Sequence, residues 1–507
     1  MYRVLTAAES RSIEMDATQD NELTLAQLMW AAGMALASVV EERVPEGAIA
    51  VFAGPGNNGG DGWVAAQHLH QAGRVVRVYT PREPSALSGE AFAAASSALE
   101  AGVEWECRIE PPEVGVSTGV AGIVDALLGI GLSGEPRQPI PAWIAAINAS
   151  DSFVLSADIP TGVDSDTGRI PGAAVRADAT VTFSALKRGL VLLPGAEFAG
   201  EVVIADVGVP TGLIAAVPSP EIWTAEEYRE LVPRHAPDVH KNGRGRLLIV
   251  AGSSTYSGAA VLAARAAVRC GTGYVTLAVP SSIVPIAQGY LLTVPVVGLP
   301  CGRTGAFSSA ALKILLRLAL EFDAVVLGPG ITLADGAVVT ARGLIERLSV
   351  PLVVDADGLN ALVDAGQLLD SRSGPTVLTP HPGELARLLS VTSEQIQADR
   401  LHFAAQLAGP DRAVVLKGAG TITSNDAHRV INTSGTPALA TAGTGDVLAG
   451  IVGGLLAQGL SPLDAGALGA YVHGKAGEAA AEHLTPICVT AEDVIEYLPA
   501  AFGELLR

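Results

Sequence analysis

"FAGPGNNGGDGW", residues 52–63, places Gly54, Gly56 and Gly59 in the order G-x-G-x-x-G of the dinucleotide-binding fingerprint. The apolar run "AIAVF" leads into this stretch, and "VAAQHLHQAG" continues it and predicts a helix over about 62–72. A strand, a glycine turn and a helix in this order are typical of an α/β domain built on a parallel sheet.

The rest of the first half continues this alternation of strands and helices. Helical patterns such as 87–101 lie between most of the apolar runs. Alternation of this kind indicates right-handed βαβ units around a mostly parallel sheet, so we expect a Rossmann-like three-layer domain. The expected strands are 48–53, 74–79, 120–124, 152–157, 179–183 and 201–205.

A proline-rich segment separates the two halves of the chain. Residues 210–243 hold five prolines, which marks a linker at about 211–240 between a domain over 1–215 and a second over 225–507. The second half is another α/β series with long helices rich in alanine and leucine. Its expected strands are 246–252, 323–327, 351–355, 375–379 and 413–416.

Composition excludes several classes of protein. The chain has 507 residues, of which 49% are apolar, so it can bury large cores. Its net charge of −20 disfavours nucleic-acid binding, which depends on Lys and Arg neutralising phosphates. The four cysteines form no C-x-x-C pair, no apolar run reaches about 18 residues, and the N-terminus has no signal pattern. We therefore expect a cytoplasmic protein with reduced thiols and neither a membrane nor a nucleic-acid partner.

The glycine loop fits a bound NAD cofactor poorly. Such a cofactor calls for an acidic residue at the end of the next strand, where residues 78–84 instead read "VYTPREP". Asp61 is expected at the helix N-terminus, where a carboxylate would repel a pyrophosphate or would simply cap the helix. The glycines could bind phosphate on backbone N–H groups or could serve only to form the turn.

Two further loops follow predicted strands and begin with a carboxylate. "DALLGIGLSGE" starts at Asp125 and "DIPTGVDSDTG" at Asp158, and parallel strands bring such ends to one edge of a sheet. Asp125 forms an oxygen-only set with Asn58 and Thr161 that suits a hard cation, although these side chains could equally satisfy turns and caps. "DSDTG", 164–168, lacks the later bidentate Glu of a calcium loop and predicts Asx turns.

In the second half the most informative string is "GTPALATAGTGDVLAG", residues 435–450. Its glycines allow backbone N–H groups to converge at the start of an expected helix, 447–460, and so to form an anion hole. Asp446 beside that hole could accept a proton from a hydroxyl that attacks phosphorus, or could cap the helix.

Other segments could belong to the same site. "VLKGAGTIT" could cradle a nucleotide phosphate, although its Lys417 could equally face solvent, and Gly330 would let the backbone approach a ligand. His381, between two prolines after a strand, could bind a ligand or be structural. Asp355 and Asp357 could contact magnesium or cap turns.

A Walker A-like match is rejected. Gly469, Gly474 and Lys475 fit part of that pattern, but Ala476 replaces the required hydroxyl. The surrounding stretch, 464–483, also predicts one continuous helix instead of a strand, a loop and a helix.

"GPGNNGGDG", "DALLGIGLSGE" and "ADIPTGVDSDTG" together resemble the N-terminal domain of the bacterial bifunctional NAD(P)H-hydrate repair enzymes, which is an NAD(P)H-hydrate epimerase. The resemblance spans most of residues 1–210. It implies a potassium ion at Asn58, Asp125 and Thr161, and contact between Asp158 and the hydrated nucleotide. The further substrate contacts it implies are Asn57, Asn58, Gly59, Gly60, Asp61, Gly129, Ile130, Gly131, Leu132, Ser133, Gly134 and Glu135.

"GSSTYSGAAVLAARAAVRCGTGYV", "LTPHPGEL" and "TAGTGDVLAG" are similar to the ADP/ATP-dependent NAD(P)H-hydrate dehydratase domain, which has a ribokinase-like α/β/α fold, over roughly 225–507. The similarity to the bacterial branch implies ADP as co-substrate, with magnesium, and suggests a homo-oligomer. Implied substrate contacts are Ala260, Gly330, His381 and Asp446, and implied ADP contacts are Lys417, Gly418, Ala419, Gly420, Thr421 and Gly445.

The expected chemistry is compatible with these residues. Epimerising a hydroxyl on C6 of the ring requires the C–O bond to break and reform through an iminium-like or ring-opened species, and Asp158 could act as acid/base or stabilise that cation. Hydroxide is a poor leaving group, so phosphorylation of the hydroxyl, with Asp446 as base, would permit elimination to NAD(P)H. Two alternatives are a ribokinase-like small-molecule kinase fused to a Rossmann-like module, and a non-enzymatic binding module.

Overall fold

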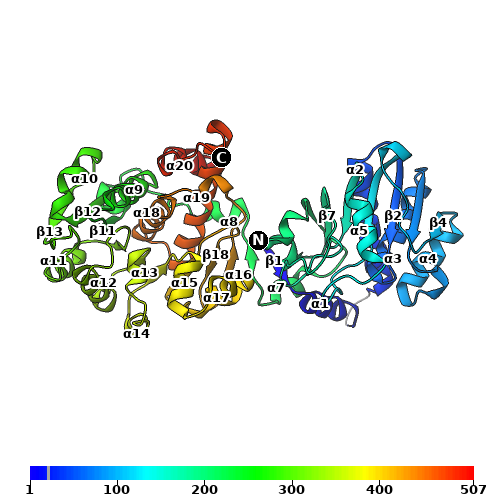
Figure 1. Cartoon of the computed structure of the whole chain (residues 1–507), viewed down its shortest axis with the longest axis horizontal. Coiled ribbons are helices and arrows are strands. Elements are labelled where there is room, and N and C mark those ends of the chain that lie inside the picture. The colour runs from blue at the N-terminus through cyan, green and yellow to red at the C-terminus, as the bar shows by residue number, and fades with distance from the viewer. Residues whose placement is uncertain (20–22) are drawn as a thin grey trace. The chain divides into compact units, whose positions relative to one another are not determined.

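The structure is a computed structural model that describes residues 1–19 and 23–507. The chain forms two compact units, Tyr2–Pro220 and Glu221–Arg507, and Met1 groups with the second. In each unit helices cover both faces of a sheet (Figure 1). Both units are therefore three-layered α/β folds, as the alternating pattern predicts.

The N-terminal unit is built on seven parallel strands in the order β4-β3-β2-β5-β6-β7-β9. The edge strand β4 was not expected, because its residues are polar and exposed and give no apolar signal. The strands are β2 (Ala48–Ala53), β3 (Val76–Thr80), β4 (Glu104–Cys107), β5 (Val120–Ala126), β6 (Phe153–Ala157), β7 (Ala179–Phe183) and β9 (Glu201–Ala205), with a separate parallel pair, β1 (Tyr2–Leu5) and β8 (Leu186–Lys187).

Side chains of alternating direction attach helices to both faces of this sheet. Val51 packs in the core beneath α2, α3 and α4, and the next residue, Phe52, packs on the opposite face against Trp143 of α5. The helices of this unit are α1 (Ala7–Gln19), α2 (Leu25–Arg43), α3 (Asn57–Gln71), α4 (Gly89–Glu100), α5 (Ile140–Asn148), α6 (Arg188–Val191) and α7 (Thr211–Ala216).

The glycine loop is tighter than expected. Helix α3 begins at Asn57, so the prediction that Asp61 caps it at the N-terminus is wrong: Asp61 lies in the second turn. A Cβ on Gly54 would stand 1.8 Å from the carbonyl oxygen of Leu127, and a Cβ on Gly59 would stand 1.9 Å from that of Gly54. These glycines are required because backbone packs directly on backbone.

The proline-rich segment is structured and does not form an open linker. It contains α7 and, from Glu221 onward, β10 (Glu221–Ile222) and α8 (Ala225–Leu231) of the C-terminal unit. Strand β10 pairs with β19 (Arg429–Ile431), and Tyr228 of α8 stacks on Tyr471 with ring centroids 4.1 Å apart. Prolines therefore mark the end of one unit, but the chain resumes regular structure at once.

The sheet of the C-terminal unit runs β13-β12-β11-β14-β15-β16-β17-β18-β19-β10. It is parallel from β13 to β17, and β18 is antiparallel to both of its neighbours. Strand β12 was missed although its apolar run is clear. The strands not yet given are β11 (Arg246–Val250), β12 (Tyr274–Pro280), β13 (Val296–Leu299), β14 (Ala324–Leu327), β15 (Leu352–Val354), β16 (Thr376–Leu378), β17 (Arg412–Leu416) and β18 (Ile422–Ser424).

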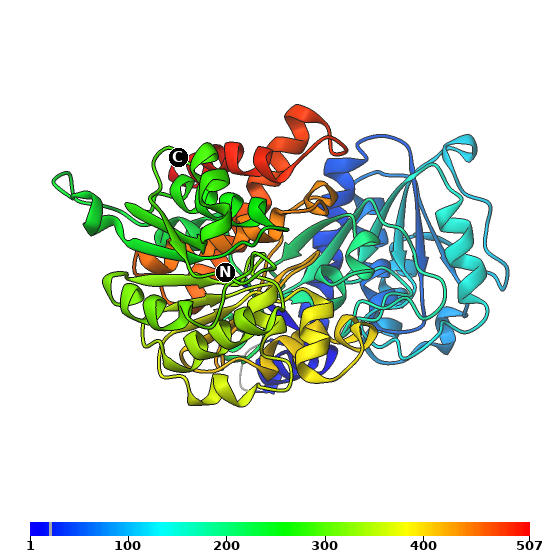
Figure 2. The same cartoon turned by 60° about the vertical axis from the view of Figure 1, so that its left-hand side comes forward.

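Helices form a layer on each face of this sheet, which gives the ribokinase-like α/β/α arrangement (Figure 2). α9, α18, α19 and α20 share one core with the sheet, and α11 and α12 share the other. The Walker A-like stretch lies inside the single helix α19, as predicted. The helices are α9 (Ser257–Arg269), α10 (Val284–Tyr290), α11 (Ala311–Leu318), α12 (Asp335–Arg347), α13 (Asp357–Asn360), α14 (Gln367–Ser371), α15 (Pro382–Leu389), α16 (Ser393–Ala398), α17 (Arg400–Gln406), α18 (Thr444–Ala457), α19 (Pro462–Leu484) and α20 (Ala491–Leu506).

Across residues 1–19 and 23–507, none of the helices combines the length and the apolar character that a membrane span requires.

Candidate active sites

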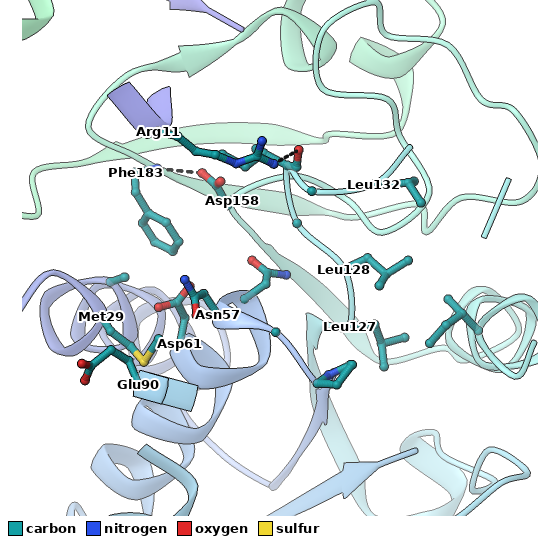
Figure 3. A pocket seen from close by; sticks show the side chains of 18 of the residues that line it. Arg11, Met29, Asn57, Asp61, Glu90, Leu127, Leu128, Leu132, Asp158 and Phe183 are labelled. Atoms are coloured by element: carbon teal, nitrogen blue, oxygen red, sulfur yellow. Dashed lines mark hydrogen bonds between the residues drawn. The ribbon is translucent and has the colours of Figure 1, made fainter. Parts of the chain in front are cut away.

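A cavity of about 1000 Å³ opens at the carboxyl ends of the strands in the N-terminal unit. Asp61 reaches it from α3, and Asp158, which follows β6, reaches it from the opposite wall (Figure 3). Met29, Leu128 and Phe183 add apolar surface to the cavity wall. The cavity is thus mixed in polarity, which suits a nucleotide with a flat ring and charged phosphates.

Asp158 is held through only one of its two carboxylate oxygens. The ammonium of Lys187, the hydroxyl of Thr182 and the N–H of Phe183 all donate to Oδ1, the last two at 3.1 and 3.2 Å. Among residues 1–19 and 23–507, none donates to Oδ2. Asp158 also has φ +63°, a conformation that costs a side-chain-bearing residue roughly 1 kcal/mol or more and often occurs at functional sites.

The three side chains expected at the cation site lie together. The hydroxyl of Thr161 donates to Oδ1 of Asp125 at 2.7 Å, and its N–H donates to Oδ2 at 2.9 Å. Asn58 packs against Gly129, where a Cβ would stand 3.1 Å from its Oδ1, and the Nδ2 of Asn58 is buried with no partner in the described part of the chain. Burial raises the pKa of the Asp125 carboxyl, while hydrogen bonds from Thr161, Ser156 and Leu127 oppose that effect.

Two more carboxyl groups line the same cavity without hydrogen-bond partners in the described ranges, those of Asp61 and Glu14. Burial raises the pKa of Asp61 well above its ordinary value, and the charges of Asp158 and Glu14 raise it further. Burial also raises the pKa of Glu14, and Asp158 adds to that effect. The cavity therefore holds carboxyl groups that differ in their readiness to carry a proton.

The structure places most of the predicted substrate contacts on the cavity wall. The loop after β5 lines it from Gly129 to Ser133 and again at Glu135. Gly59 and Gly60 do not line it; they are buried against Gly54 and Met29. The lining residues that had been predicted are Asn57, Asn58, Asp61, Gly129, Ile130, Gly131, Leu132, Ser133, Glu135 and Asp158.

Sequence reasoning missed three residues of this site: Lys187, Glu14 and Arg11. Arg11 donates to the carbonyl of Ile130 at 3.1 Å and so ties α1 to the cavity loop (Figure 3). Lys187 had one available signal, because it is the sole lysine among residues 1–240, whereas arginine is common there. A single lysine with 2% of its side chain exposed is a specific choice, since its charge must be compensated nearby.

In the C-terminal unit, a second set of predicted residues meets at the start of α18. Gly443, with φ +94°, precedes the helix, and Gly445 and Asp446 occupy its first turn. The Nζ of Lys417 lies 3.5 Å from the position that a Cβ on Gly445 would take. Burial and the negative charge of Asp355 raise the pKa of Asp446 to about 7, which suits a general base near neutral pH.

Lys417 forms the centre of an ionic cluster. Its Nζ lies 2.8 Å from Oδ1 of Asp355 and 3.7 Å from Oε2 of Glu384, and Thr379 donates to the same Asp355 oxygen at 2.7 Å. Burial opposes the charge on Lys417, but the two carboxylates outweigh it and raise its pKa. The lysine that was expected to contact a nucleotide phosphate is thus also bound to the carboxylates next to the predicted base.

His381 caps α15. Its Nδ1 accepts from the N–H of Gly383 at 3.0 Å, and its own N–H donates to Glu384 at 2.8 Å. Because Nδ1 acts as an acceptor, the ring proton is assigned to Nε2, on an exposed side chain that can still donate to a ligand. Burial of the ring lowers its pKa, so the neutral form prevails at neutral pH.

The loop after β17 is shaped by Arg400. Its guanidinium donates to the carbonyls of Leu416, Lys417 and Gly420, and burial lowers its pKa to about 10. This loop contains the predicted nucleotide contacts Lys417, Gly418, Ala419, Gly420 and Thr421. Arg400 was not singled out from the sequence, and it had no motif to distinguish it.

Two predicted substrate contacts lie on either side of the start of α9. Gly330, with φ +64°, approaches so closely that a Cβ would meet Tyr256 at 2.7 Å and Ala259 at 3.1 Å. Ala260 is fully buried in the core, so its neighbour Ala259 is the side chain that faces Gly330. His473 of α19 was missed: it is buried, and its Nε2 has no partner in the part of the chain that the structure describes.

The fold and the two sites define a two-domain α/β protein with a Rossmann-like N-terminal unit and a ribokinase-like C-terminal unit. Comparisons agree with this class. The family model described as NAD(P)H-hydrate dehydratase matches residues 247–500, and the model described as YjeF-related protein N-terminus matches residues 25–189. The chain belongs to the bifunctional NAD(P)H-hydrate repair enzyme family.

Relatives of this family match the chain along its full length. The bifunctional NAD(P)H-hydrate repair enzyme of Moorella thermoacetica is 39% identical over 100% of this chain and 97% of that protein. The enzyme of the same name from Escherichia coli is 34% identical over 98% of this chain and 93% of that protein. Among solved structures, the ADP/ATP-dependent NAD(P)H-hydrate dehydratase of Bacillus subtilis, co-crystallised with ATP and Mg²⁺, matches 56% of this chain and 99% of its own with a TM-score of 0.50 and 27% identity.

Proposed function

We propose that this chain repairs hydrated NADH and NADPH: the unit Tyr2–Pro220 interconverts the R and S hydrates, and the unit Glu221–Arg507 dehydrates the S form with ADP, releasing AMP and phosphate. The observation that carries the proposal is the full-length match to repair enzymes that have both units in this order, at up to 39% identity. We keep a cytoplasmic location and a homo-oligomer as predictions.

The geometry of the N-terminal cavity supports epimerisation. The ring carbon that carries the hydroxyl becomes cationic when its C–O bond breaks, and a carboxylate close by lowers the energy of that cation. Asp158 meets this requirement, because it lines the cavity and Lys187 binds its Oδ1, which leaves Oδ2 available to a bound ring. The apolar lining formed by Met29 and Phe183 limits water around the reacting ring.

Potassium at Asn58, Asp125 and Thr161 fits the donors that are present. All three supply oxygen atoms, which hard cations prefer, and Asp125 adds a buried carboxylate to the set. The Nδ2 of Asn58 is buried and lacks a partner in the described ranges, so no hydrogen bond within them fixes the orientation of its carboxamide. We propose that the ion orders the glycine loop and the loop after β5 against each other.

The start of α18 supports phosphoryl transfer. Backbone N–H groups at Gly443 to Gly445 can bind the transferred phosphoryl group, and Asp446 can take the proton of the attacking hydroxyl. We propose that the loop Lys417 to Thr421 binds ADP. Magnesium would neutralise charge on the phosphates. Of the two aspartates after β15, Asp355 keeps its Oδ2 without a donor in the described ranges, whereas both oxygens of Asp357 accept hydrogen bonds, from the N–H of Thr332 and the side-chain amide of Asn360.

One assay tests the proposal. Mixed R and S hydrates, with ADP and magnesium, should return fully to NADH, followed by the absorbance of the reduced nicotinamide, with one AMP formed per NADH. Asp446→Asn should abolish this recovery, while Glu482→Gln, an exposed acid on α19, should leave it unchanged. A stable phosphorylated product with no NADH would contradict the proposal and would favour a small-molecule kinase.

A further inference from the structure

Five carboxyl groups line the N-terminal cavity, those of Glu14, Asp61, Glu90, Glu135 and Asp158, together with the guanidinium groups of Arg11, Arg82 and Arg137. In the described ranges, the cation that forms a direct ion pair with one of these carboxyl groups is Lys187. Lys187 is bound to Asp158, with further bonds to the Thr182 hydroxyl and the Phe183 carbonyl. Asp158 therefore has a direct cationic partner, and Asp61 has none in the described ranges.

Asp61 is better placed than Glu14, the other cavity carboxyl group whose pKa burial raises. Asp61 lies in the second turn of α3. The first turn packs closely against the preceding loop, since a Cβ on Gly59 would stand 1.9 Å from the carbonyl oxygen of Gly54, and this packing holds the backbone at Asp61 in place. The Asp61 residue is 9% exposed, and its carboxyl makes no hydrogen bond to any residue of the described ranges. Glu14 is more exposed and has Arg11 nearby on α1 to offset its charge.

We propose that Asp61, in its neutral carboxylic acid form, is the general acid that protonates the departing C6 hydroxyl during epimerisation. This inference rests on the proposed function and deepens it, since it separates the proton donor, Asp61, from the anion that stabilises the cation, Asp158. The two side chains reach the cavity from opposite walls, so a ring bound between them presents its hydroxyl to one and its cationic face to the other (Figure 3).

The step is balanced without a further reactant. The Asp61 proton passes to the hydroxyl oxygen, the C6–O bond pair leaves with that oxygen as water, and the ring nitrogen lone pair forms the C=N bond. Water then adds an oxygen lone pair to the other face of C6, and the C=N pair returns to nitrogen. The proton released by that water passes to solvent, Asp61 regains a proton from solvent, and only the configuration at C6 changes.

The charged groups around Asp61 set the pH range over which it can act. Glu14 and Arg11 come from α1, Glu90 from α4, Asp158 from the end of β6, and Lys187 from β8. Burial together with Asp158 and Glu14 raises the pKa of Asp61, and Lys187 opposes them. Epimerisation should consequently fail at high pH, when the carboxylic acid is lost.

The test measures interconversion of R and S hydrates by chromatography, without ADP, across pH. Wild type must interconvert them; if it does not, the proposed function fails first. With wild type active, Asp61→Asn should be at least about 100-fold slower and lose the high-pH decline. Glu14→Gln should move the high-pH decline to lower pH, because it removes a charge that raises the pKa of Asp61.

Two comparisons keep the result interpretable. Glu100→Gln, at the exposed end of α4, removes a carboxylate outside the cavity and should match wild type. If circular dichroism shows that Asp61→Asn misfolds, the proposal is decided by comparing the pH at which epimerisation declines in wild type and in Glu14→Gln. The proposal is overturned if folded Asp61→Asn interconverts the hydrates at a rate within about 5-fold of wild type. It is also overturned if the high-pH decline of Glu14→Gln occurs at the same pH as that of wild type.

Discussion

Replacing Lys417 with methionine should move the acid limb of dehydration toward higher pH. The pKa of Asp446 is about 7, and the base must be ionised, so kcat/KM should fall as the pH drops below about 7. The positive charge of Lys417 lowers the pKa of Asp446 and so keeps it that low. Lys417→Met removes this charge while the chain length remains similar.

The magnitude is an order-of-magnitude estimate for one pair of charges. Lys417 is the cation that lowers the pKa of Asp446, and its Nζ lies 3.5 Å from the position that a Cβ on the neighbouring Gly445 would take. Unit charges at about 5 Å and an effective dielectric of about 20 interact by about 3 kcal/mol. Asp446 is partly exposed, so we discount this to about 1.5–3 kcal/mol, or about 1–2 pH units.

The assay compares pH profiles of kcat/KM for NADH recovery in wild type, Lys417→Met and Lys417→Arg. A loss of ADP affinity lowers kcat/KM at every pH but does not shift the pH of the acid limb. The ionisation of ADP affects all three proteins alike. Lys417→Arg keeps the charge and should keep the limb close to that of wild type. If the acid limb of Lys417→Met coincides with that of wild type, Lys417 does not control the pKa of Asp446 and the reasoning is refuted.

Three other predictions concern the ion, the core and stability at low pH. Exchanging potassium for lithium should slow R/S interconversion by at least about 10-fold and leave dehydration of pure S hydrate unchanged, because the proposed cation site lies in the N-terminal cavity; equal rates in both salts would argue against the site. Gly59→Ala should destabilise the N-terminal unit by about 3 kcal/mol or more, since its Cβ would stand 1.9 Å from the carbonyl of Gly54, whereas Gly73→Ala in an open turn should cost less; urea unfolding measures both. Burial lowers the pKa of His473 from 6.5 to about 4, so protons bind the unfolded state more tightly than the folded state. As the pH falls from about 6.5 to 4, the free energy of unfolding of wild type should therefore drop by up to about 3 kcal/mol relative to that of His473→Leu. Melting temperatures of the two proteins that run parallel across that range would contradict this prediction.

Much of the fold follows from local patterns. Apolar runs with intervening helical periodicity place the buried central strands within a few residues, because strands buried on both faces are continuously apolar. Strand β4 escapes this signal because it lies at an exposed edge with polar side chains. The place of Asp446 at the start of a helix could be predicted from the sequence, because a glycine-rich turn comes directly before an apolar helical run.

The sequence by itself determined the two α/β units and the loops that bear the chemistry, because strand, turn and helix preferences are local. Only the tertiary structure decided how those loops act together. It showed that Gly54 and Gly59 serve backbone packing, that Asp61 lies within a helix, and that Lys187 engages Asp158. These facts depend on residues far apart in the chain, whose mutual distance and burial set the charge that each can carry.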